Sequence, residues 1–231
     1  MSNIYTDGTY AEANPTWHQE DSPWKAGQIL RLFKKHRLEP KSVAEIGCGA
    51  GGILRCLHDA IQSQTEFHGY DIASAPLELA KKAATDRLQF HNEDLLAAPA
   101  TFDLLLVIDV IEHVPDYLGF LTRCRQKATL KIYHIPLEIH VSSTLRGTVA
   151  GARKSVGHIH YFTAETALAC LQDTGHRIVD VLYTPGALGL VRFHPRLKSR
   201  LANIPRRAVG LFSEKFSQRL FGGYSLLVLA E

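Results

Sequence analysis

The stretch EIGCGAGG, residues 45–52, constrains the fold of this 231-residue chain more than any other feature. The apolar run SVAEI leads into it like a buried strand, and ILRCLHDAI follows it with apolar residues at helical spacing. A strand that passes into a helix through closely spaced glycines predicts a turn whose backbone lies against a ligand, because a Cβ atom there would block the approach. The motif therefore predicts an α/β domain that binds a cofactor at this turn.

The rest of the chain alternates between strand-like and helix-like segments. Helices are predicted from Ser22, Ser74, Pro115 and Thr163, and the twenty residues from Pro136 look like a loop. Strands are predicted at FHGYDI (67–72), RLQFHN (87–92), FDLLLVID (102–109), TLKIYHI (129–135), RIVDVLY (177–183) and YSLLVLAE (224–231). Alternating strands and helices predict a doubly wound, mostly parallel sheet with right-handed crossovers.

The glycines fit two kinds of cofactor site. Gly47, Gly49 and Gly52 match the G-x-G-x-x-G of a dinucleotide site, whereas Gly47, Gly49 and Gly51 after Glu45 match a loop that holds S-adenosylmethionine. Plain turn glycines are a third explanation. A carboxylate at Glu45, inside an apolar strand, needs partners, which the ammonium group of a methionine moiety and backbone amides supply. About forty residues precede the strand, and the chain has neither a Y-x-x-x-K pair nor a second glycine loop, which favours the methyl donor.

AEIGCGAGG, GYDI, NEDLL and DVIEHV follow one another in an order and spacing that resemble class I S-adenosylmethionine-dependent methyltransferases. The resemblance is strongest to the ubiquinone-pathway O-methyltransferase branch and covers roughly residues 40–185 plus the last strand. It implies a seven-stranded sheet of order 3-2-1-4-5-7-6 with an antiparallel last strand and an N-terminal helical lid. It also implies methyl transfer to a small molecule, most readily to a hydroxyl. Lipid-, sugar- or RNA-linked acceptors, an NAD-dependent oxidoreductase or epimerase, and a cofactor-binding sensor are the alternatives.

The same resemblance implies which residues hold the cofactor. Those around the methionine portion are Glu45, Gly47, Cys48, Gly49 and Gly51. Those around the ribose and adenine are Asp71, Ile72, Asp94 and Leu95, with Asp109 and Val110 on the pocket floor and Trp24 in the lid. For Asp71 a helix-capping or solvated carboxylate is the alternative, and for Asp94 a solvated loop charge. Lys25 is a candidate to neutralise the cofactor carboxylate.

Histidines are the candidates for the chemistry. His113 follows the fourth strand, and an imidazole pKa of about 6.5 suits a general base; His18 is a second candidate, and capping or lining the pocket is the alternative for His113. Asp109, Glu112 and His113, followed by His158 and His160, resemble the metal-binding pattern of small-RNA 3′-end methyltransferases. This predicts Glu112, His113 and His158 as ligands of a divalent ion. Two observations speak against it: Asp109 is shorter than the glutamate of that pattern, and His158 could simply pack beside Tyr161.

We divide the chain into an N-terminal lid, residues 1–38, and a methyltransferase domain, residues 39–231, with a basic helical insertion at 186–221. Between Arg192 and Arg219 the chain has eight basic residues and one acid, Glu214. An amphipathic helix from Pro205 suits a lipid or membrane surface, or an acidic substrate, better than nucleic acid; a pocket wall packed on the sheet is the alternative. No signal peptide, spanning run or C-x-x-C pair is visible, which predicts a cytoplasmic enzyme. The acceptor and the oligomeric state follow no code that the sequence reveals.

Overall fold

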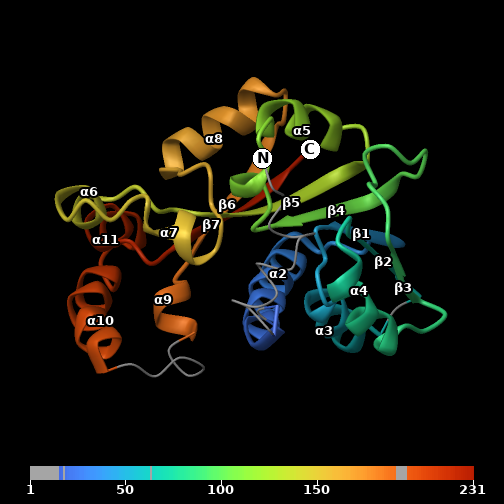
Figure 1. The fold of residues 1–231 in the computed structure, drawn as a ribbon, viewed down its shortest axis with the longest axis horizontal. Coiled ribbons are helices and arrows are strands. Elements are labelled where there is room, and N and C mark those ends of the chain that lie inside the picture. The colour runs from blue at the N-terminus through green and yellow to red at the C-terminus, as the bar shows by residue number, and fades with distance from the viewer. Residues whose placement is uncertain (1–15, 18, 63, 191–196) are drawn as a thin grey trace.

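The computed structural model describes residues 16–17, 19–62, 64–190 and 197–231 (Figure 1). Its strands form one sheet of order β3-β2-β1-β4-β5-β7-β6, in which β1 to β5 are parallel and β7 is antiparallel to both neighbours. The strands are β1 (Ser42–Ile46), β2 (Glu66–Tyr70), β3 (Leu88–His91), β4 (Phe102–Ile108), β5 (Ala128–Pro136), β6 (Ile178–Thr184) and β7 (Ser225–Ala230). The predicted fold class and strand order are confirmed.

Helices cover both faces of the sheet (Figure 1). On one face lie α2 (Ser22–His36), α3 (Gly52–Ala60) and α4 (Ser74–Ala80), and on the other α5 (Tyr117–Cys124) and α8 (Ala164–Asp173). Side chains of β4 alternate between the two cores: Leu104 and Leu106 belong to the core under α2 and α3, and Leu105 to the core under α5 and α8. The continuous apolar run of this strand is therefore explained by burial on both faces.

The remaining 3₁₀ turns and helices complete the described part of the chain. They are the 3₁₀ turns η1 (Gln19–Asp21), η2 (Lys81–Ala83) and η3 (Ile111–His113), and the helices α6 (Val141–Leu145), α7 (Gly151–Ser155), α9 (Gly186–Gly189), α10 (Leu197–Gly210) and α11 (Glu214–Phe221). Within the described ranges, no helix has both the length and the apolar character that crossing a membrane requires.

Two sequence predictions need correction. The segment after Pro136 is not simply a loop, because α6 begins at a capping box in which His140 Nδ1 accepts from the Ser143 amide (3.2 Å) and Ser143 Oγ accepts from the His140 amide (3.0 Å). The single helix predicted from Pro205 is two helices, with Pro205 inside α10. The second helix starts afresh because Ser213 Oγ accepts from the Phe216 amide (3.1 Å).

Candidate active site

The glycine turn between β1 and α3 has a backbone that other residues cannot adopt easily. Gly47, Gly49 and Gly51 have φ values of 71°, 52° and 73°. A Cβ on Gly51 would lie 2.5 Å from the Phe90 ring, and one on Gly47 would lie 2.8 Å from Val110 Cγ2. Gly49 is different, since no atom of the described residues lies within 4 Å of its Cβ position. The described part of the chain thus leaves free the space in front of Gly49 that a ligand can occupy.

Glu45 is a buried carboxylate beside this turn. Glu45 is only 2% exposed, and its Oε2 atom has no hydrogen-bond partner in the described structure. Burial raises the pKa of Glu45 well above its ordinary value, against the opposing charge of Lys25. A buried acceptor without a donor is costly. Because a methionine ammonium group provides such a donor, the site fits the amino-acid end of S-adenosylmethionine.

Cys48 lies in the glycine turn with its side chain buried. The Cys48 thiol packs on β2, since a Cβ on Gly69 would lie 2.8 Å from its Sγ atom. Burial raises the pKa of this thiol well above its ordinary value, which keeps it neutral. The side chain therefore supports the turn from below.

Asp71 ties the end of β2 to the glycine turn. Its carboxylate accepts from the backbone amides of Gly49 and Ala73, both at 2.8 Å. Burial raises the pKa of Asp71, and these two hydrogen bonds oppose the rise. Ile72 beside it is 61% exposed, an apolar surface suited to adenine.

The next two predicted adenine contacts differ in exposure. Asp94 is exposed, and its Oδ1 accepts from the Leu96 amide at 2.9 Å. The Leu95 side chain is fully buried in the core under α5.

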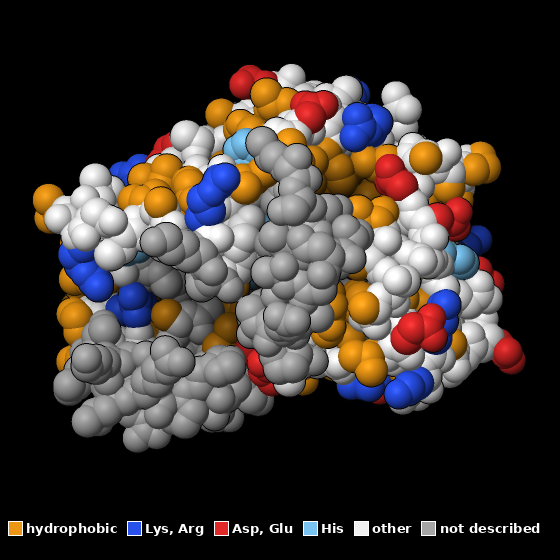
Figure 2. Space-filling view, in the orientation of Figure 1, with side chains coloured by type: hydrophobic (Ala, Val, Ile, Leu, Met, Phe, Trp, Pro, Cys, Tyr) orange, Lys and Arg blue, Asp and Glu red, His pale blue; other side chains and the backbone are white. Residues whose placement is uncertain are grey.

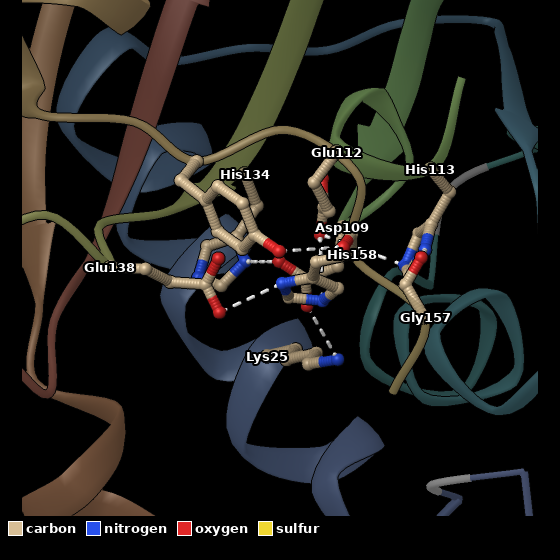
Figure 3. Close-up of polar contacts among 9 residues, drawn as sticks. Lys25, Asp109, Glu112, His113, His134, Glu138, Gly157 and His158 are labelled. Carbon is tan, nitrogen blue, oxygen red and sulfur yellow. Dashed lines mark hydrogen bonds and ion pairs between the residues drawn. The ribbon is translucent and has the colours of Figure 1, made fainter. Parts of the chain in front are cut away.

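Asp109 is an ion-pair anchor at the end of β4 (Figure 3). Its two oxygens contact Lys25 Nζ of α2 at 2.7 Å and His134 Nδ1 of β5 at 2.6 Å, and His134 Nε2 lies 3.0 Å from Thr184 Oγ1. Burial alone would raise the pKa of Asp109. The charges and hydrogen bonds of His134 and Lys25 lower this pKa by more than burial raises it, so that it lies below the ordinary value. Lys25, a candidate partner of the cofactor carboxylate, pairs with Asp109 instead.

Glu112, His113 and His158 lie together beyond this anchor, with one potential ligand atom each within 4.8 Å of one another. His113 Nδ1 lies 3.3 Å from the Gly157 carbonyl and His158 Nδ1 lies 2.8 Å from Glu138 Oε1 (Figure 3). The Gly157 carbonyl and an ionised Glu138 carboxylate can only accept hydrogen bonds. Each histidine therefore carries its proton on Nδ1, and the Nε2 atom of each neutral ring is an acceptor. These Nε2 atoms lie 4.0 Å and 3.8 Å from Glu112 Oε1.

The cluster consequently has acceptors but few donors. Glu112 is fully buried and neither of its carboxylate oxygens has a hydrogen-bond partner in the described structure. Burial raises the pKa of Glu112 well above its ordinary value, with the charges of Asp109 and Glu138 acting in the same direction. Either a proton on Glu112 or a cation between the three groups satisfies them. Two imidazoles and a carboxylate fit a divalent transition metal, and Glu138 behind His158 is the outer-shell partner such ligands commonly have.

Two members of the predicted metal pattern lie outside this cluster. Asp109 is held by Lys25 and His134. His160 Nε2 bonds the Val114 carbonyl at 3.0 Å, and its ring packs on Tyr117 with centroids 4.6 Å apart. The backbone explains the difference between neighbouring histidines, because the Ile159 and His160 amides both donate to the Glu112 carbonyl and turn His158 toward His113.

The remaining candidates have mixed outcomes. His18 lies outside the described residues. Trp24 stands edge-on to His134, with ring centroids 6.4 Å apart, and packs against Gly189 of α9. Sequence reasoning missed Glu138 and His134. Their positions on β5 and just past its carboxyl end, where ligands bind in open α/β sheets, were the signal that could have found them.

A cavity of about 330 Å³ adjoins the cluster at the carboxyl end of β5. Glu138, His140, Thr148, Ala187 and Tyr224 are among its lining residues, and none of the described lining residues is a lysine or arginine. Its size is within the range of small-molecule sites.

The comparisons with known proteins agree with this geometry. A family described as a methyltransferase domain matches residues 16–181. Norajmaline N-methyltransferase of Rauvolfia serpentina is 34% identical over 105 residues, 42% of this chain and 35% of that protein. Ubiquinone biosynthesis O-methyltransferase of Actinobacillus pleuropneumoniae serotype 5b is 32% identical over 134 residues, 50% of this chain and 55% of that protein. The chain thus spans about half the length, or less, of these relatives.

Solved structures share the whole fold. Magnesium protoporphyrin IX methyltransferase of Synechocystis PCC 6803, with bound S-adenosylhomocysteine, superposes with a TM-score of 0.66 over 100% of this chain and 99% of that chain at 14% identity. S-adenosylmethionine is the cofactor of such enzymes, and the dinucleotide-dependent alternative is set aside. The family match covers well over half of the sequence, so the chain belongs to the methyltransferase domain family and has the class I S-adenosylmethionine-dependent fold.

Proposed function

We propose that this chain transfers a methyl group from S-adenosylmethionine to a hydroxyl of a small acceptor in the cytoplasm. The observation that carries the proposal is the cluster of Glu112, His113 and His158 beside the glycine turn. Val110, two residues before Glu112, packs on Gly47, so the proton-accepting groups adjoin the cofactor turn. Among the described residues, the neighbouring cavity is lined by the Glu138 carboxylate and by no lysine or arginine, which suits an acceptor without phosphate or carboxylate groups.

In this mechanism the protein aligns the acceptor, excludes water and moves one proton, because the sulfonium methyl is already activated. His158 takes the hydroxyl proton on Nε2 while Glu138 holds its Nδ1, the arrangement that orients a catalytic imidazole. His113 is a weak base, since burial lowers its pKa to about 4. The acceptor oxygen becomes an ether and S-adenosylhomocysteine leaves.

Radiolabelled methyl transfer over a panel of phenols, catechols and amines tests the proposal, with lipid-, sugar- and RNA-linked hydroxyls as further arms. We expect labelled ethers from small hydroxyl acceptors. Glu138→Gln should lower kcat by roughly 10- to 100-fold while S-adenosylhomocysteine binds as before, because the amide does not stabilise a protonated His158. Exclusive labelling of amines, or an unchanged kcat in this variant, would overturn the assignment.

A second candidate mechanism uses the same residues differently. Glu112, His113 and His158 would hold a divalent ion that lowers the pKa of a bound hydroxyl, and His158 Nε2 would then ligate the ion instead of accepting the proton. Elemental analysis of the dialysed protein tests this separately from activity: under this second mechanism the wild type holds about one equivalent of metal and Glu112→Gln loses it. Full turnover in excess EDTA, with no metal found by elemental analysis, would exclude the ion. His158 would then act as the base, and a proton on Glu112 would satisfy its buried carboxyl group.

A further inference from the structure

The hairpin formed by α10 and α11 has its polarity reversed. Among its described residues, the fully buried side chains are polar: Asn203, Ser217 and Gln218 are 4%, 0% and 2% exposed. Four large apolar side chains are exposed, Ile204 to 62%, Leu211 to 87%, Phe212 to 92% and Phe216 to 54%, beside the exposed charges of Arg207, Glu214 and Lys215. A surface helix ordinarily shows the opposite arrangement. The reversal indicates that the outer face meets an environment other than bulk water.

Specific contacts fix the hairpin in this orientation. The Arg206 guanidinium donates to the carbonyls of Gly222 (2.6 Å) and Phe221 (2.9 Å), and it also contacts Asn203. Ser217 Oγ donates to the Arg206 carbonyl at 3.0 Å and accepts from the Tyr224 hydroxyl at 3.1 Å. Because these polar groups are satisfied only with this face inward, rotating the helices to bury the apolar residues would break the whole set.

The outer face combines apolar and basic residues in two stripes. Along α10, Arg207 lies between Ile204 and Leu211 at helical spacing. Along α11 and the turn before it, Lys215 lies between Phe212 and Phe216. Arg207 and Lys215 are exposed, whereas Arg206 is engaged inside the hairpin and Arg219 contacts Glu165. Hydrophobic and basic side chains lie side by side at the edge of the molecule where Figure 1 places α6 and α11 (Figure 2).

We propose that the outer face of the α10–α11 hairpin docks on the surface of an anionic lipid bilayer. Leu211 and Phe212, at the tip, enter the headgroup–acyl boundary, while Arg207 and Lys215 meet lipid phosphates, the division of labour of interfacial helices. A second copy of the chain fits less well, because it would bring two basic faces together. Nucleic acid fits less well too: Phe212 and Phe216 offer stacking surfaces, but the described part of this face has only two exposed basic side chains not engaged elsewhere, Arg207 and Lys215, beside the acid Glu214.

Sedimentation of the full chain with vesicles tests the docking. With 70% phosphatidylcholine and 30% phosphatidylglycerol, we expect binding that weakens when salt is raised, and weaker binding to phosphatidylcholine alone. Leu211→Ser combined with Phe212→Ser should lower the partition coefficient at least ten-fold, and Arg207→Glu with Lys215→Glu should remove the preference for the anionic vesicles. Circular dichroism and S-adenosylhomocysteine binding confirm that each variant is folded.

Matched controls carry equal changes elsewhere. Leu79→Ser with Leu118→Ser alters two exposed leucines of α4 and α5, and Lys34→Glu with Lys82→Glu alters two exposed lysines; both double variants should bind like the wild type. Absence of vesicle binding, or equal losses in test and control variants, overturns the proposal. So does a hairpin-dependent dimer in analytical ultracentrifugation, or an RNA oligonucleotide that binds while vesicles do not.

Discussion

Two buried carboxyl groups, Glu45 at the cofactor turn and Glu112 in the histidine cluster, are central to the candidate site. Glu45 and Glu112 are both almost fully buried and both lack donors for at least one oxygen. Such groups do not stabilise a fold, because an isolated buried charge is unfavourable. Asp109, equally close to the site, differs because Lys25 and His134 satisfy it. Among the described residues, neither Glu45 nor Glu112 finds a donor for these oxygens, so a ligand, an ion or a proton is the partner we expect for each.

Glu45→Gln should separate binding from stability. We expect its affinity for S-adenosylhomocysteine to fall about 10- to 100-fold, roughly 1.4–2.8 kcal/mol, since a charged acceptor is lost. The free energy of unfolding without ligand should stay equal or rise. Titration calorimetry and urea denaturation measure the two effects, with exposed Glu66→Gln as the control. A destabilised variant with unchanged affinity contradicts the assignment of Glu45.

His176 makes stability depend on pH. Burial lowers the pKa of His176 from 6.5 to about 4, and its Nε2 lies 2.7 Å from the Tyr133 hydroxyl. Between these two values the unfolded chain binds the extra proton, so the free energy of unfolding falls as the pH falls. From pH 7 to 4.5 this loss is about 2 kcal/mol for wild type relative to His176→Gln. Urea denaturation of both proteins at pH 7 and pH 4.5 measures this loss. An equal change in the free energy of unfolding for wild type and variant would contradict the lowered pKa of His176.

At the scale of elements, periodicity and capping residues explain what the sequence could predict. The apolar runs of β1 and β4 and the cap at Thr163, whose Oγ1 accepts from the Thr166 amide at 3.1 Å, are local signals. The start of α6 was missed because its cap is a histidine, which seldom serves as one. The cluster partner Glu138 was missed because only tertiary structure brings it beside His158, twenty residues later. The orientation of α10 and α11 could not be predicted either, because it depends on hydrogen bonds from Arg206 to the carbonyls of Phe221 and Gly222, some fifteen residues away.

The turn between β1 and α3 should tolerate no Cβ at Gly51. Gly51→Ala places a methyl group 2.5 Å from the Phe90 ring at a φ of 73°, and we expect a loss of roughly 1–3 kcal/mol in the free energy of unfolding together with weaker cofactor binding. Gly27→Ala in α2 is the matched change, since nothing lies within 4 Å of its Cβ position; it should stabilise by about 0.5–1 kcal/mol. Thermal unfolding of both variants measures the two changes. A Gly51→Ala variant that is stabilised, as Gly27→Ala is expected to be, would show that the turn does not require glycine at position 51.

At the scale of the whole molecule, one sheet carries the cofactor turn, the anchor and the cluster at the carboxyl ends of its strands. Lys25 joins α2 to β4, and Trp24 of the same helix packs on α9, so the N-terminal helix contacts both the sheet and the segment before the hairpin. Cofactor binding at this edge should therefore stabilise the molecule as a unit.

S-adenosylhomocysteine at a hundred times its Kd should raise the free energy of unfolding by about 2.7 kcal/mol. For a domain of this size the melting temperature should rise by roughly 5–10 °C. NAD at the same concentration should leave it unchanged, because the buried Glu45 carboxyl is placed for an ammonium group and not for a pyrophosphate. Differential scanning fluorimetry with both ligands checks this, and a shift with NAD alone would reverse the choice of cofactor.

The insertion of β7 between β5 and β6 has a consequence for synthesis on the ribosome. Within the sheet, β6 pairs with β7 and with no other strand, and β7 comes about forty residues later in the chain. While those residues are still being translated, β6 has no edge to join, and β5 exposes its open side. The nascent chain therefore waits for its final strand before the sheet closes, and chaperones have an unpaired edge to protect until then.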